Sequence, residues 1–370
     1  MARILITGGA GFIGSHLADE LLHSGHAVKV FDLLCSQVHG AEKQSPEYLN
    51  SDIELVLGDV RDRAAVDQAL QGIDAVYHFA AAVGVGQSMY EVEHYASIND
   101  IGTAVLLEAL IKHPVERLIV ASSMSVYGEG LYRSRRGAIH CAVERSPTQL
   151  RSARWDPLDE DGAALEPIPT PESKTPALSS VYALSKYVQE RMCLMIGRAY
   201  NIPTVALRFF NVYGPRQALS NPYTGVLAIF ASRLLNGKAP LIFEDGEQQR
   251  DFVNVRDVVQ ACRLSLDSAS APDRVFNIGS GQAFTISELA ERMADALGKN
   301  LEPQITGKYR VGDIRHCFAD IALARSMLGY APQVSLEDGV VELADWLEGQ
   351  IANDHVDSAS AELAARGLTL

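Results

Sequence analysis

The sequence of 370 residues predicts an α/β protein, in which a doubly wound parallel sheet is followed by a smaller C-terminal α/β lobe. Three observations favour this fold class. Short β-rich runs alternate with amphipathic helical patterns up to about residue 125. A glycine-rich turn joins the first of these runs to the first helix. Finally, 47% of the residues are hydrophobic and 21% are charged, which is typical of a globular protein with a sizeable core.

The strands of the main sheet are expected where short apolar runs are rich in β-branched and aromatic residues. The first helix, Ile13–Ser24, has a single apolar face, and Gly25 is a suitable C-terminal cap. Another helix is expected to begin near Val181. The predicted strands are Arg3–Thr7, Ala27–Phe31, Ile53–Leu57, Ala75–Phe79, Leu118–Ser122 and Thr204–Phe209.

The alternating pattern stops at Gly130 and resumes after Pro176. The stretch between them is rich in proline and lacks periodicity, so we expect a loop-rich surface insertion over about 131–176. Beyond Gly214-Pro215, further short elements predict the smaller lobe, and residues 351–370 form a tail that is compatible with a helix. The elements expected in this lobe are the strands Leu241–Phe243, Phe252–Val255 and Val275–Ile278 and the helices Ile286–Leu297, Ile321–Leu328 and Leu336–Gln350.

Charge and cysteine usage exclude several classes of protein. The 46 acidic and 32 basic residues give a net charge of −14, which disfavours nucleic acid and anionic membranes as partners. The sequence has neither a signal peptide nor an apolar run of membrane-spanning length. Five scattered cysteines suit a reducing compartment, so we expect a cytoplasmic protein. Cys141 has only His140 beside it, and no metal site is expected.

The glycine-rich turn Gly8-Gly9-Ala10-Gly11-Phe12-Ile13-Gly14 predicts a dinucleotide site. Gly8 permits the tight turn, Gly11 lets the backbone approach a pyrophosphate, and Gly14 allows close packing of strand and helix. The N-terminus of the next helix then offers unpaired N–H groups and a positive dipole end to the phosphates.

Two acidic residues indicate which dinucleotide binds. Asp32 follows the second strand, where a carboxylate accepts hydrogen bonds from both ribose hydroxyls and repels a 2′-phosphate, so NAD is favoured over NADP. Asp59 follows the third strand and is placed to meet the adenine amino group. We therefore expect residues 1–215 to form a Rossmann-type NAD-binding domain. Residues 216–350 would be mainly a substrate-binding lobe, with some segments returning to the first domain.

Tyr182 and Lys186 are the candidate catalytic pair. Their spacing of four residues puts both side chains on one helix face. A free tyrosine has a pKa near ~10, but a neighbouring ammonium group and a positive nicotinamide ring favour the phenolate. Lys186 can also hold the nicotinamide ribose, and Ser122 and Ser123, at a strand end, can donate a hydrogen bond to the substrate oxygen.

These motifs, together with others in the same order, make the chain resemble the extended short-chain dehydrogenase/reductase family, which includes nucleotide-sugar epimerases and dehydratases. The resemblance covers nearly the whole chain. It implies a tightly held NAD and a nucleotide-diphosphate sugar as substrate. The additional matching segments are His78-Phe79-Ala80-Ala81, Asn99, Arg208-Phe209-Phe210-Asn211-Val212-Tyr213-Gly214-Pro215, Arg250-Asp251-Phe252-Val253, Asn277-Ile278-Gly279-Ser280-Gly281 and Gly312-Asp313-Ile314-Arg315.

The same resemblance implies roles for individual residues. Arg250 and Arg315 would pair with the diphosphate, and Asn211 would contact the sugar or its phosphates. The other expected substrate contacts are Ser123, Met124, Ser125 and Arg216. The expected cofactor contacts, besides the three glycines and two acidic residues above, are Phe12, Ile13, Val60, Phe79, Ala80, Ala81, Asn99, Ser122, Tyr182, Lys186 and Phe209.

Met124 and Ser125 indicate which reaction of the family is expected. Family dehydratases carry an Asp-Glu pair after the catalytic Ser or Thr, and family decarboxylases keep a Glu two residues beyond it. This chain has neither carboxylate, so nothing evident would remove a C5 proton. Redox-neutral epimerisation at C4 through a 4-keto sugar is therefore predicted, which makes the protein an isomerase.

The insertion narrows the expected substrate further. Its segments Tyr127–Arg133, Gln149-Leu150, Trp155-Asp156-Pro157 and Pro167–Thr170 resemble the dTDP-L-rhamnose 4-epimerase subgroup, whose product is dTDP-6-deoxy-L-talose. A UDP-glucose or UDP-glucuronate 4-epimerase is the alternative. A nucleotide-sugar 4,6-dehydratase and a non-catalytic NAD-binding protein come after it.

The family resemblance also implies a homodimer. Its interface would be formed by the helices that begin near Asn99 and Val181, although core packing explains the same apolar pattern. The apolar residues expected in that interface are Val105, Leu106, Leu110, Val188, Met192 and Met195.

Overall fold

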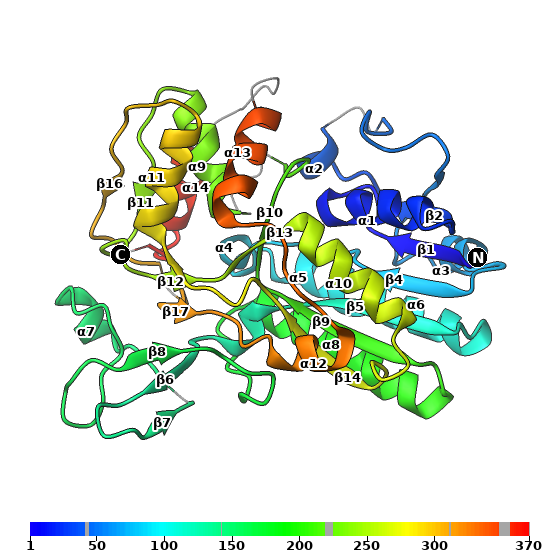
Figure 1. Cartoon of the computed structure of the whole chain (residues 1–370), viewed down its shortest axis with the longest axis horizontal. Coiled ribbons are helices and arrows are strands. Elements are labelled where there is room, and N and C mark those ends of the chain that lie inside the picture. The colour runs from blue at the N-terminus through cyan, green and yellow to red at the C-terminus, as the bar shows by residue number, and fades with distance from the viewer. Residues whose placement is uncertain (41–43, 142, 219–224, 311, 348–355, 370) are drawn as a thin grey trace.

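The computed structural model describes residues 1–40, 44–141, 143–218, 225–310, 312–347 and 356–369. Its main sheet has seven strands in the order β14-β9-β5-β4-β1-β2-β3, and all of its pairings are parallel (Figure 1). The predicted fold class is therefore confirmed. The strands are β1 (Arg3–Thr7), β2 (Ala27–Asp32), β3 (Glu54–Leu57), β4 (Ala75–His78), β5 (Arg117–Ser123), β9 (Thr204–Phe209) and β14 (Arg274–Ile278).

Strand β14 corrects the sequence prediction. We expected Val275–Ile278 in the C-terminal lobe, but it pairs with β9 at the edge of the main sheet, where Phe276 lies opposite Leu207. Phe276 and Ile278 are both fully buried. A short apolar run of this kind suits a strand covered on both faces, and its position in the sequence does not reveal which sheet it joins.

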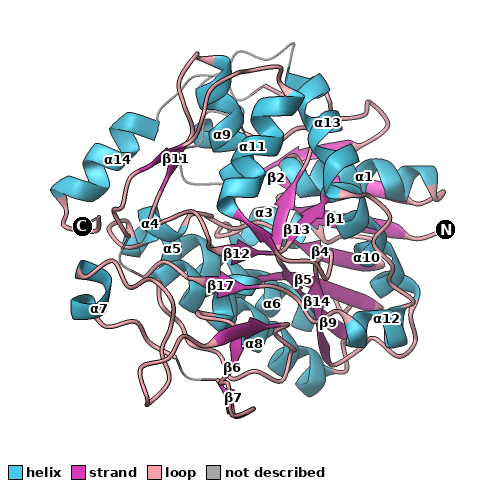
Figure 2. Ribbon diagram, turned by 60° about the vertical axis from the view of Figure 1, so that its left-hand side comes forward, coloured by secondary structure: helices cyan, strands magenta, loops and turns pink. Residues whose placement is uncertain are grey.

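The main sheet has an apolar core on each face because alternate residues of a strand point to opposite sides. Ile4 and Ile6 join one core, under α1, α10 and α12. Leu5 joins the other, under α3, α6 and α8. Figure 2 shows these helices around the strands. The bounds are α1 (Phe12–His23), α3 (Arg63–Ala69), α6 (Gly102–Lys112), α8 (Val181–Tyr200), α10 (Val255–Asp267) and α12 (Ala322–Leu328).

The second core corrects part of the expected dimer face. Leu106 and Leu110 are fully buried within the single chain, where they pack toward the sheet. Val105 and Met192 are partly buried against the same core. Met195, by contrast, has 55% of its surface exposed. The apolar pattern of α6 is therefore explained mainly by packing within the chain.

The C-terminal lobe has its own core between α9, α11 and α13, which includes Phe230, Met293 and Leu343. The predicted helix Leu336–Gln350 is confirmed up to Leu347, and its last three residues lie outside the described part of the chain. The lobe's elements are β10 (Asn211–Tyr213), α9 (Val226–Leu235), β11 (Leu241–Ile242), β12 (Gln249–Arg250), β13 (Phe252–Asn254), β15 (Phe284–Thr285), α11 (Ile286–Ala296), β16 (Gln304–Ile305), β17 (His316–Cys317) and α13 (Leu336–Leu347).

The insertion is more ordered than its sequence predicts. It forms a three-stranded antiparallel sheet in the order β7-β6-β8, and Thr170 makes a β-bridge to Ala319. The described part of the tail contains the helix α14 (Val356–Ala365). The other short elements are α2 (Ser36–His39), α4 (Val85–Ser88), α5 (Val92–Tyr95), the π-helix Ala96–Ile101, the 3₁₀ helix Met124–Tyr127, β6 (Leu131–Arg133), β7 (Ile139–His140), α7 (Pro147–Arg151) and β8 (Glu166–Ile168).

Candidate active site

The glycine turn between β1 and α1 has the shape that a pyrophosphate requires. Gly8 has a φ of +71°, and a Cβ there would lie 2.7 Å from the Ala80 nitrogen. A Cβ on Gly14 would lie 2.6 Å from the Gly8 oxygen, so both positions need glycine. A Cβ on Gly11 would meet only the Gly8 oxygen, at 3.4 Å. Gly11 thus leaves open space in front of the backbone, next to the first residues of α1, Phe12 and Ile13.

Asp32 is fixed beside this turn at the end of β2. One carboxylate oxygen accepts a hydrogen bond from the Ala10 N–H at 3.0 Å, and the other accepts one from the Leu34 N–H at 2.9 Å. Each carboxylate oxygen has a further lone pair for a ribose hydroxyl. The turn and Asp32 therefore fit the diphosphate and ribose of a dinucleotide.

Asp59 and Val60 lie one strand further along, and the structure gives both of them partners in the protein. The Asp59 carboxylate forms an ion pair with Arg61 at 2.6 Å, and this hydrogen bonding lowers the pKa of Asp59. Val60 is buried, and a Cβ on Gly102 would lie 2.6 Å from its side chain. An adenine contact from Asp59 would have to share this carboxylate with Arg61.

Ser123 and Tyr182 are brought together at the carboxyl end of β5. The Ser123 oxygen accepts hydrogen bonds from the Ser125 N–H at 3.2 Å and from the Ser125 hydroxyl at 2.9 Å. These bonds orient the Ser123 side chain, which lies near the Tyr182 hydroxyl. Burial raises the pKa of Tyr182, and the nearby Ser123 side chain opposes part of that effect. Met124, next to Ser123, is buried.

The first turn of α8 holds Tyr182 in place. Ser180 caps this helix by accepting a hydrogen bond from the Ala183 N–H at 3.1 Å. The Tyr182 N–H donates to the Ser88 hydroxyl at 3.0 Å, which ties α8 to α4. The Tyr182 ring also packs edge-on against the ring of Tyr95. Its position is therefore determined by three separate elements.

Lys186 lies one turn after Tyr182 on the same helix face and is buried. Its ammonium group donates a hydrogen bond to the Gln189 side chain at 2.9 Å. Burial lowers the pKa of Lys186 to about 8, because a low-dielectric environment disfavours the cation. The site thus holds an ammonium group that can lose its proton near neutral pH.

A buried chain of hydrogen bonds leads from Lys186 to the loop after β4. Gln189 donates to the Thr103 hydroxyl at 2.8 Å, and His78 shares 2.8 Å hydrogen bonds with Thr103 and, through its other nitrogen, with Thr7. Burial lowers the pKa of His78 to about 3, so the imidazole is neutral. The Thr7 hydroxyl accepts a hydrogen bond from the Ala80 N–H at 3.3 Å.

The other expected cofactor residues lie around this loop. The Asn99 amide group bonds both backbone groups of Ala82 and donates to the Ser185 hydroxyl at 2.9 Å. Asn99 therefore fixes the end of the loop that contains Ala80 and Ala81. Below them, the rings of Phe79 and Phe209 meet edge to face, with their centroids 5.9 Å apart.

Ser122 is turned away from Ser123 and into the protein. Its hydroxyl donates to the fully buried Glu190 at 2.7 Å, and Glu190 also accepts two hydrogen bonds from Arg208, at 2.8 and 2.7 Å. Arg208 continues to the Tyr127 hydroxyl at 2.8 Å. No sequence motif singled out Glu190. Its position four residues after Lys186, on the same helix face, was the available signal.

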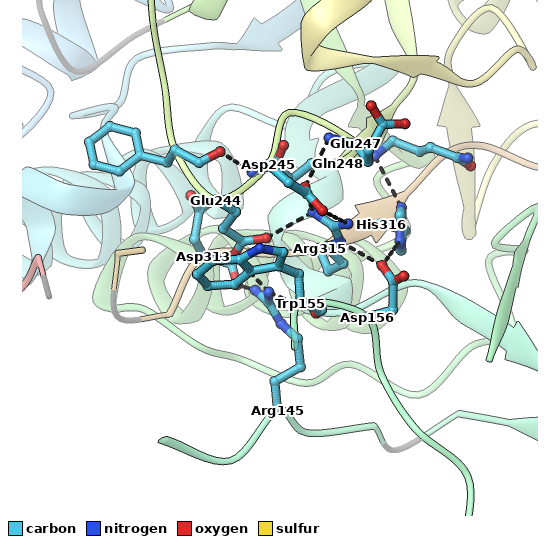
Figure 3. A network of polar contacts seen from close by, with 12 residues as sticks. Arg145, Trp155, Asp156, Glu244, Asp245, Glu247, Gln248, Asp313, Arg315 and His316 are labelled. Atoms are coloured by element: carbon cyan, nitrogen blue, oxygen red, sulfur yellow. Dashed lines mark hydrogen bonds and ion pairs between the residues drawn. The ribbon is translucent and has the colours of Figure 1, made fainter. Parts of the chain in front are cut away.

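Arg315, expected at the substrate diphosphate, is instead held by carboxylates. Only 1% of its side chain is exposed, and it forms ion pairs with Asp156 at 2.8 Å, Glu244 at 3.0 Å and Asp245 at 2.6 Å (Figure 3). Arg145 of the insertion joins the same cluster through Glu244, at 2.6 Å. These contacts connect the insertion to the C-terminal lobe and leave Arg315 little capacity for another anion.

Two other arginines lie beside this cluster. Arg250 donates to the backbone oxygens of Ile314 and Arg315 and lies 4.0 Å from the Asp313 carboxylate. Arg310, which the sequence analysis missed, pairs with the other oxygen of Asp313 at 3.4 Å and lies over the Phe243 ring. The Arg310 side chain is 43% exposed. Both guanidinium groups therefore meet at Asp313.

The remaining two expected substrate residues have partners elsewhere. Asn211, in β10, donates from its side chain to the backbone oxygen of Asp251 at 3.0 Å. Arg216 forms a 2.7 Å ion pair with Asp19 on α1 and lies over the Tyr48 ring. Among the described residues, no contact joins Arg216 to Ser123 or Tyr182.

The chain is similar to known proteins over nearly its whole length. The model of the NAD dependent epimerase/dehydratase family matches residues 4–153 and 159–279. A dTDP-L-rhamnose 4-epimerase of Burkholderia thailandensis is 37% identical over 94% of this chain and 96% of its own. A UDP-glucose 4-epimerase of Thermotoga maritima, solved with UDP-glucose, superposes with a TM-score of 0.76 at 33% identity, covering 94% and 98% of the two chains. A UDP-glucuronic acid 4-epimerase variant of Bacillus cereus, solved with NAD, gives 0.76 at 29% identity, covering 94% and 99%.

The chain therefore belongs to the NAD dependent epimerase/dehydratase family, within the extended short-chain dehydrogenases/reductases. It is an NAD-dependent nucleotide-sugar 4-epimerase, and thus an isomerase. Among the described residues, no helix is both long and apolar enough to cross a membrane.

Proposed function

We propose that Tyr182, Ser123 and Lys186 carry the acid–base chemistry at C4 of the sugar. Tyr182 takes the proton of the C4 hydroxyl and returns it after the 4-keto sugar has turned its other face to the cofactor. Ser123 donates a hydrogen bond to the same oxygen, and the Lys186 ammonium group favours the phenolate form of Tyr182. NAD, when bound, would supply the acceptor and donor of the C4 hydride. The observation that carries this proposal is the proximity of Ser123, oriented by Ser125, to Tyr182, with Lys186 one turn further along α8.

We propose further that Gly8, Gly11, Gly14 and Asp32 hold the NAD, with their open backbone and fixed carboxylate as the support. Asn99 acts as a positioning residue, because it orders the loop after β4. The cofactor must stay bound through the whole cycle, since each turnover uses the same hydride twice.

For the substrate, we propose dTDP-L-rhamnose, converted to dTDP-6-deoxy-L-talose. The likeness to the Burkholderia enzyme supports this, and so does the loop that leads into α4 beside Tyr182. Residues 82–86 of this loop are only alanine, valine and glycine, and Val83 and Val85 are 45% and 37% exposed. An apolar wall suits the methyl group of a 6-deoxy sugar and offers no cation to the carboxylate of a uronate.

The test of this substrate is direct. The purified protein is incubated separately with dTDP-L-rhamnose, UDP-glucose and UDP-glucuronate, and the products are identified by NMR. We expect inversion at C4 of dTDP-L-rhamnose. Faster inversion of either UDP-sugar would replace the proposed substrate. Release of water from dTDP-glucose, in a fourth incubation, would indicate a dehydratase instead.

The pKa of Lys186 predicts how the activity depends on pH. Because burial lowers this pKa to about 8, the ammonium group is lost as the pH rises through that value. We expect kcat/KM to fall on the alkaline side of about pH 8. The Lys186→Met variant should be less active and should lack this alkaline limb. Rates measured from pH 6 to 10 for both proteins check this, and an unchanged alkaline limb in the variant would assign the limb to another group.

For the diphosphate, we propose Arg250 and Arg310 in place of the expected Arg250 and Arg315. Both guanidinium groups meet at Asp313, and Arg310 is partly exposed. A lost hydrogen bond to a charged group costs about 1.5–3 kcal/mol, so Arg310→Ala should raise KM by roughly 10- to 100-fold. Arg325→Ala, which removes an exposed arginine on α12, is the control. Steady-state kinetics check this, and equal KM values in the two variants would remove Arg310 from the site.

We also propose that the enzyme is a cytoplasmic homodimer. The described cysteines are all unpaired, which suits a reducing compartment. The large apolar side chains of Ile101, Leu184 and Met195, on the π-helix and α8, are 57%, 47% and 55% exposed and offer a surface for a second copy. Sedimentation of the purified protein tests the dimer, and a monomer at micromolar concentration would contradict it.

A further inference from the structure

The C-terminal helix α14 packs against the loop that adjoins Tyr182. Leu363 of α14 is 6% exposed, and a Cβ on Gly86 would lie only 3.4 Å from its side chain. Just beyond the helix, the Arg366 guanidinium group lies 4.3 Å from the centre of the Tyr90 ring. Figure 2 shows α14 beside α4, which comprises Val85–Ser88. The tail thus contacts α4 and the residues after it.

The same segment is anchored on the C-terminal lobe. Asp357, in the first turn of α14, forms ion pairs with Arg233 at 2.8 Å and with Lys238 at 2.9 Å. At the other end, Thr369 makes an antiparallel β-bridge with Arg310. Residues 356–369 therefore connect the lobe that carries Arg310 to the helix α4, which contains Gly86, and to Tyr90 just after it. We call these residues the C-terminal strap.

The contacts of the strap with α4 and with Arg310 both lie next to residues proposed to bind the substrate. Ser88 accepts a hydrogen bond from the Tyr182 N–H at 3.0 Å, so the α4 segment that Leu363 covers is the one that holds the first turn of α8. Arg310 is the half-exposed arginine proposed for the diphosphate. The sugar and the diphosphate of one substrate would therefore bind at two places that the strap connects.

We propose that the C-terminal strap completes the nucleotide-sugar site, with Leu363 and Arg366 as positioning residues that hold the α4 segment and Thr369 as the one that holds Arg310. This inference rests on the proposed function for the location of the substrate. It predicts that the strap matters for binding nucleotide sugar more than for binding NAD. The contacts given above lie on α4, Tyr90, Arg310 and the two cations of the lobe, and none of them is with the glycine turn or Asp32.

The first experiment measures amide hydrogen exchange in the full chain with NAD, with and without saturating dTDP or UDP. We expect a nucleoside diphosphate to slow exchange in residues 356–369 and 85–90. This readout needs no turnover, so it stands even when the substrate assay fails. If the region around Arg310 responds to the nucleotide and the strap does not, the proposal is wrong.

The second experiment compares Leu363→Ala and Arg366→Ala with Ala364→Ser, a change at an exposed position of the same helix. The two strap variants should raise KM about tenfold, which corresponds to roughly 1.4 kcal/mol of binding, while kcat and NAD content change less. Ala364→Ser should match the wild type. Unchanged KM in both strap variants, or an equal loss of NAD and activity, would show that the strap does not complete the nucleotide-sugar site. Deletion of residues 356–370 should give the same KM effect or a larger one in protein that stays folded.

Discussion

Replacing Tyr182 with phenylalanine should abolish turnover while the protein keeps its NAD. The change removes one oxygen and leaves the ring, which packs edge-on against Tyr95. General acid–base catalysis contributes roughly 10²- to 10⁴-fold to a rate, and Tyr182 is the proposed acid and base of this reaction. We therefore expect kcat to fall by at least about 10²-fold. Product formation followed by NMR, together with NAD released from denatured protein, gives both quantities.

Tyr187→Phe is the matched control. It makes the same chemical change one residue after Lys186, where the ring packs against the apolar core and not against Ser123. This variant should keep nearly full activity. If Tyr182→Phe retains activity as well, then the proton is moved by another group. If it loses NAD together with activity, Tyr182 acts mainly through cofactor binding.

Local signals in the sequence predicted much of the fold and part of the site. The glycine turn, Asp32 and the Tyr182–Lys186 pair each depend on a few neighbouring residues, and the structure places them at strand ends and on one helix face. Such features are fixed by backbone geometry within a turn or two. For this reason their positions could be inferred before any long-range contact was known.

The positions that sequence reasoning missed are set by long-range contacts. Arg315 lies in a motif that favours an anion, yet its partners Asp156 and Glu244 come from the insertion and from the loop after β11. Nothing near Arg315 in the sequence shows that these carboxylates converge there. Arg310 was overlooked because its exposure depends on how Phe243 and Asp313 lie around it.

Strand β14 shows the same limit at the level of the fold. Its sequence predicts a buried strand correctly, but the choice between two sheets depends on the chain returning from the lobe to pair with β9. For the insertion, in contrast to β14, the short strands themselves were not predicted. Its prolines suggested a loop, but its short strands pair with one another, and the Thr170–Ala319 bridge joins the segment after β8 to the segment after β17. Tertiary packing overrides weak local preference in both cases.

Glu190 gives the largest expected effect on stability. It is fully buried, and its two oxygens accept the Arg208 guanidinium group and the Ser122 hydroxyl. Glu190→Gln keeps the size of the side chain but leaves the Arg208 cation buried without its counter-charge. It also places the new amide N–H next to the Ser122 and Arg208 groups that donate hydrogen bonds to Glu190. Breaking a buried ion pair in this way costs about 3–5 kcal/mol. We expect the free energy of unfolding, measured with urea, to fall by that amount.

The control for this prediction is Glu108→Gln, which breaks an ion pair with Arg63 in which both side chains are about half exposed. Exposed pairs contribute roughly 0–1 kcal/mol, so this variant should unfold almost like the wild type. A second test removes the cation as well. Glu190→Gln combined with Arg208→Met should be more stable than the sum of the two single changes predicts, because no uncompensated charge is left. Additive effects would mean that Glu190 stabilises the fold through Ser122 and packing, and not through Arg208.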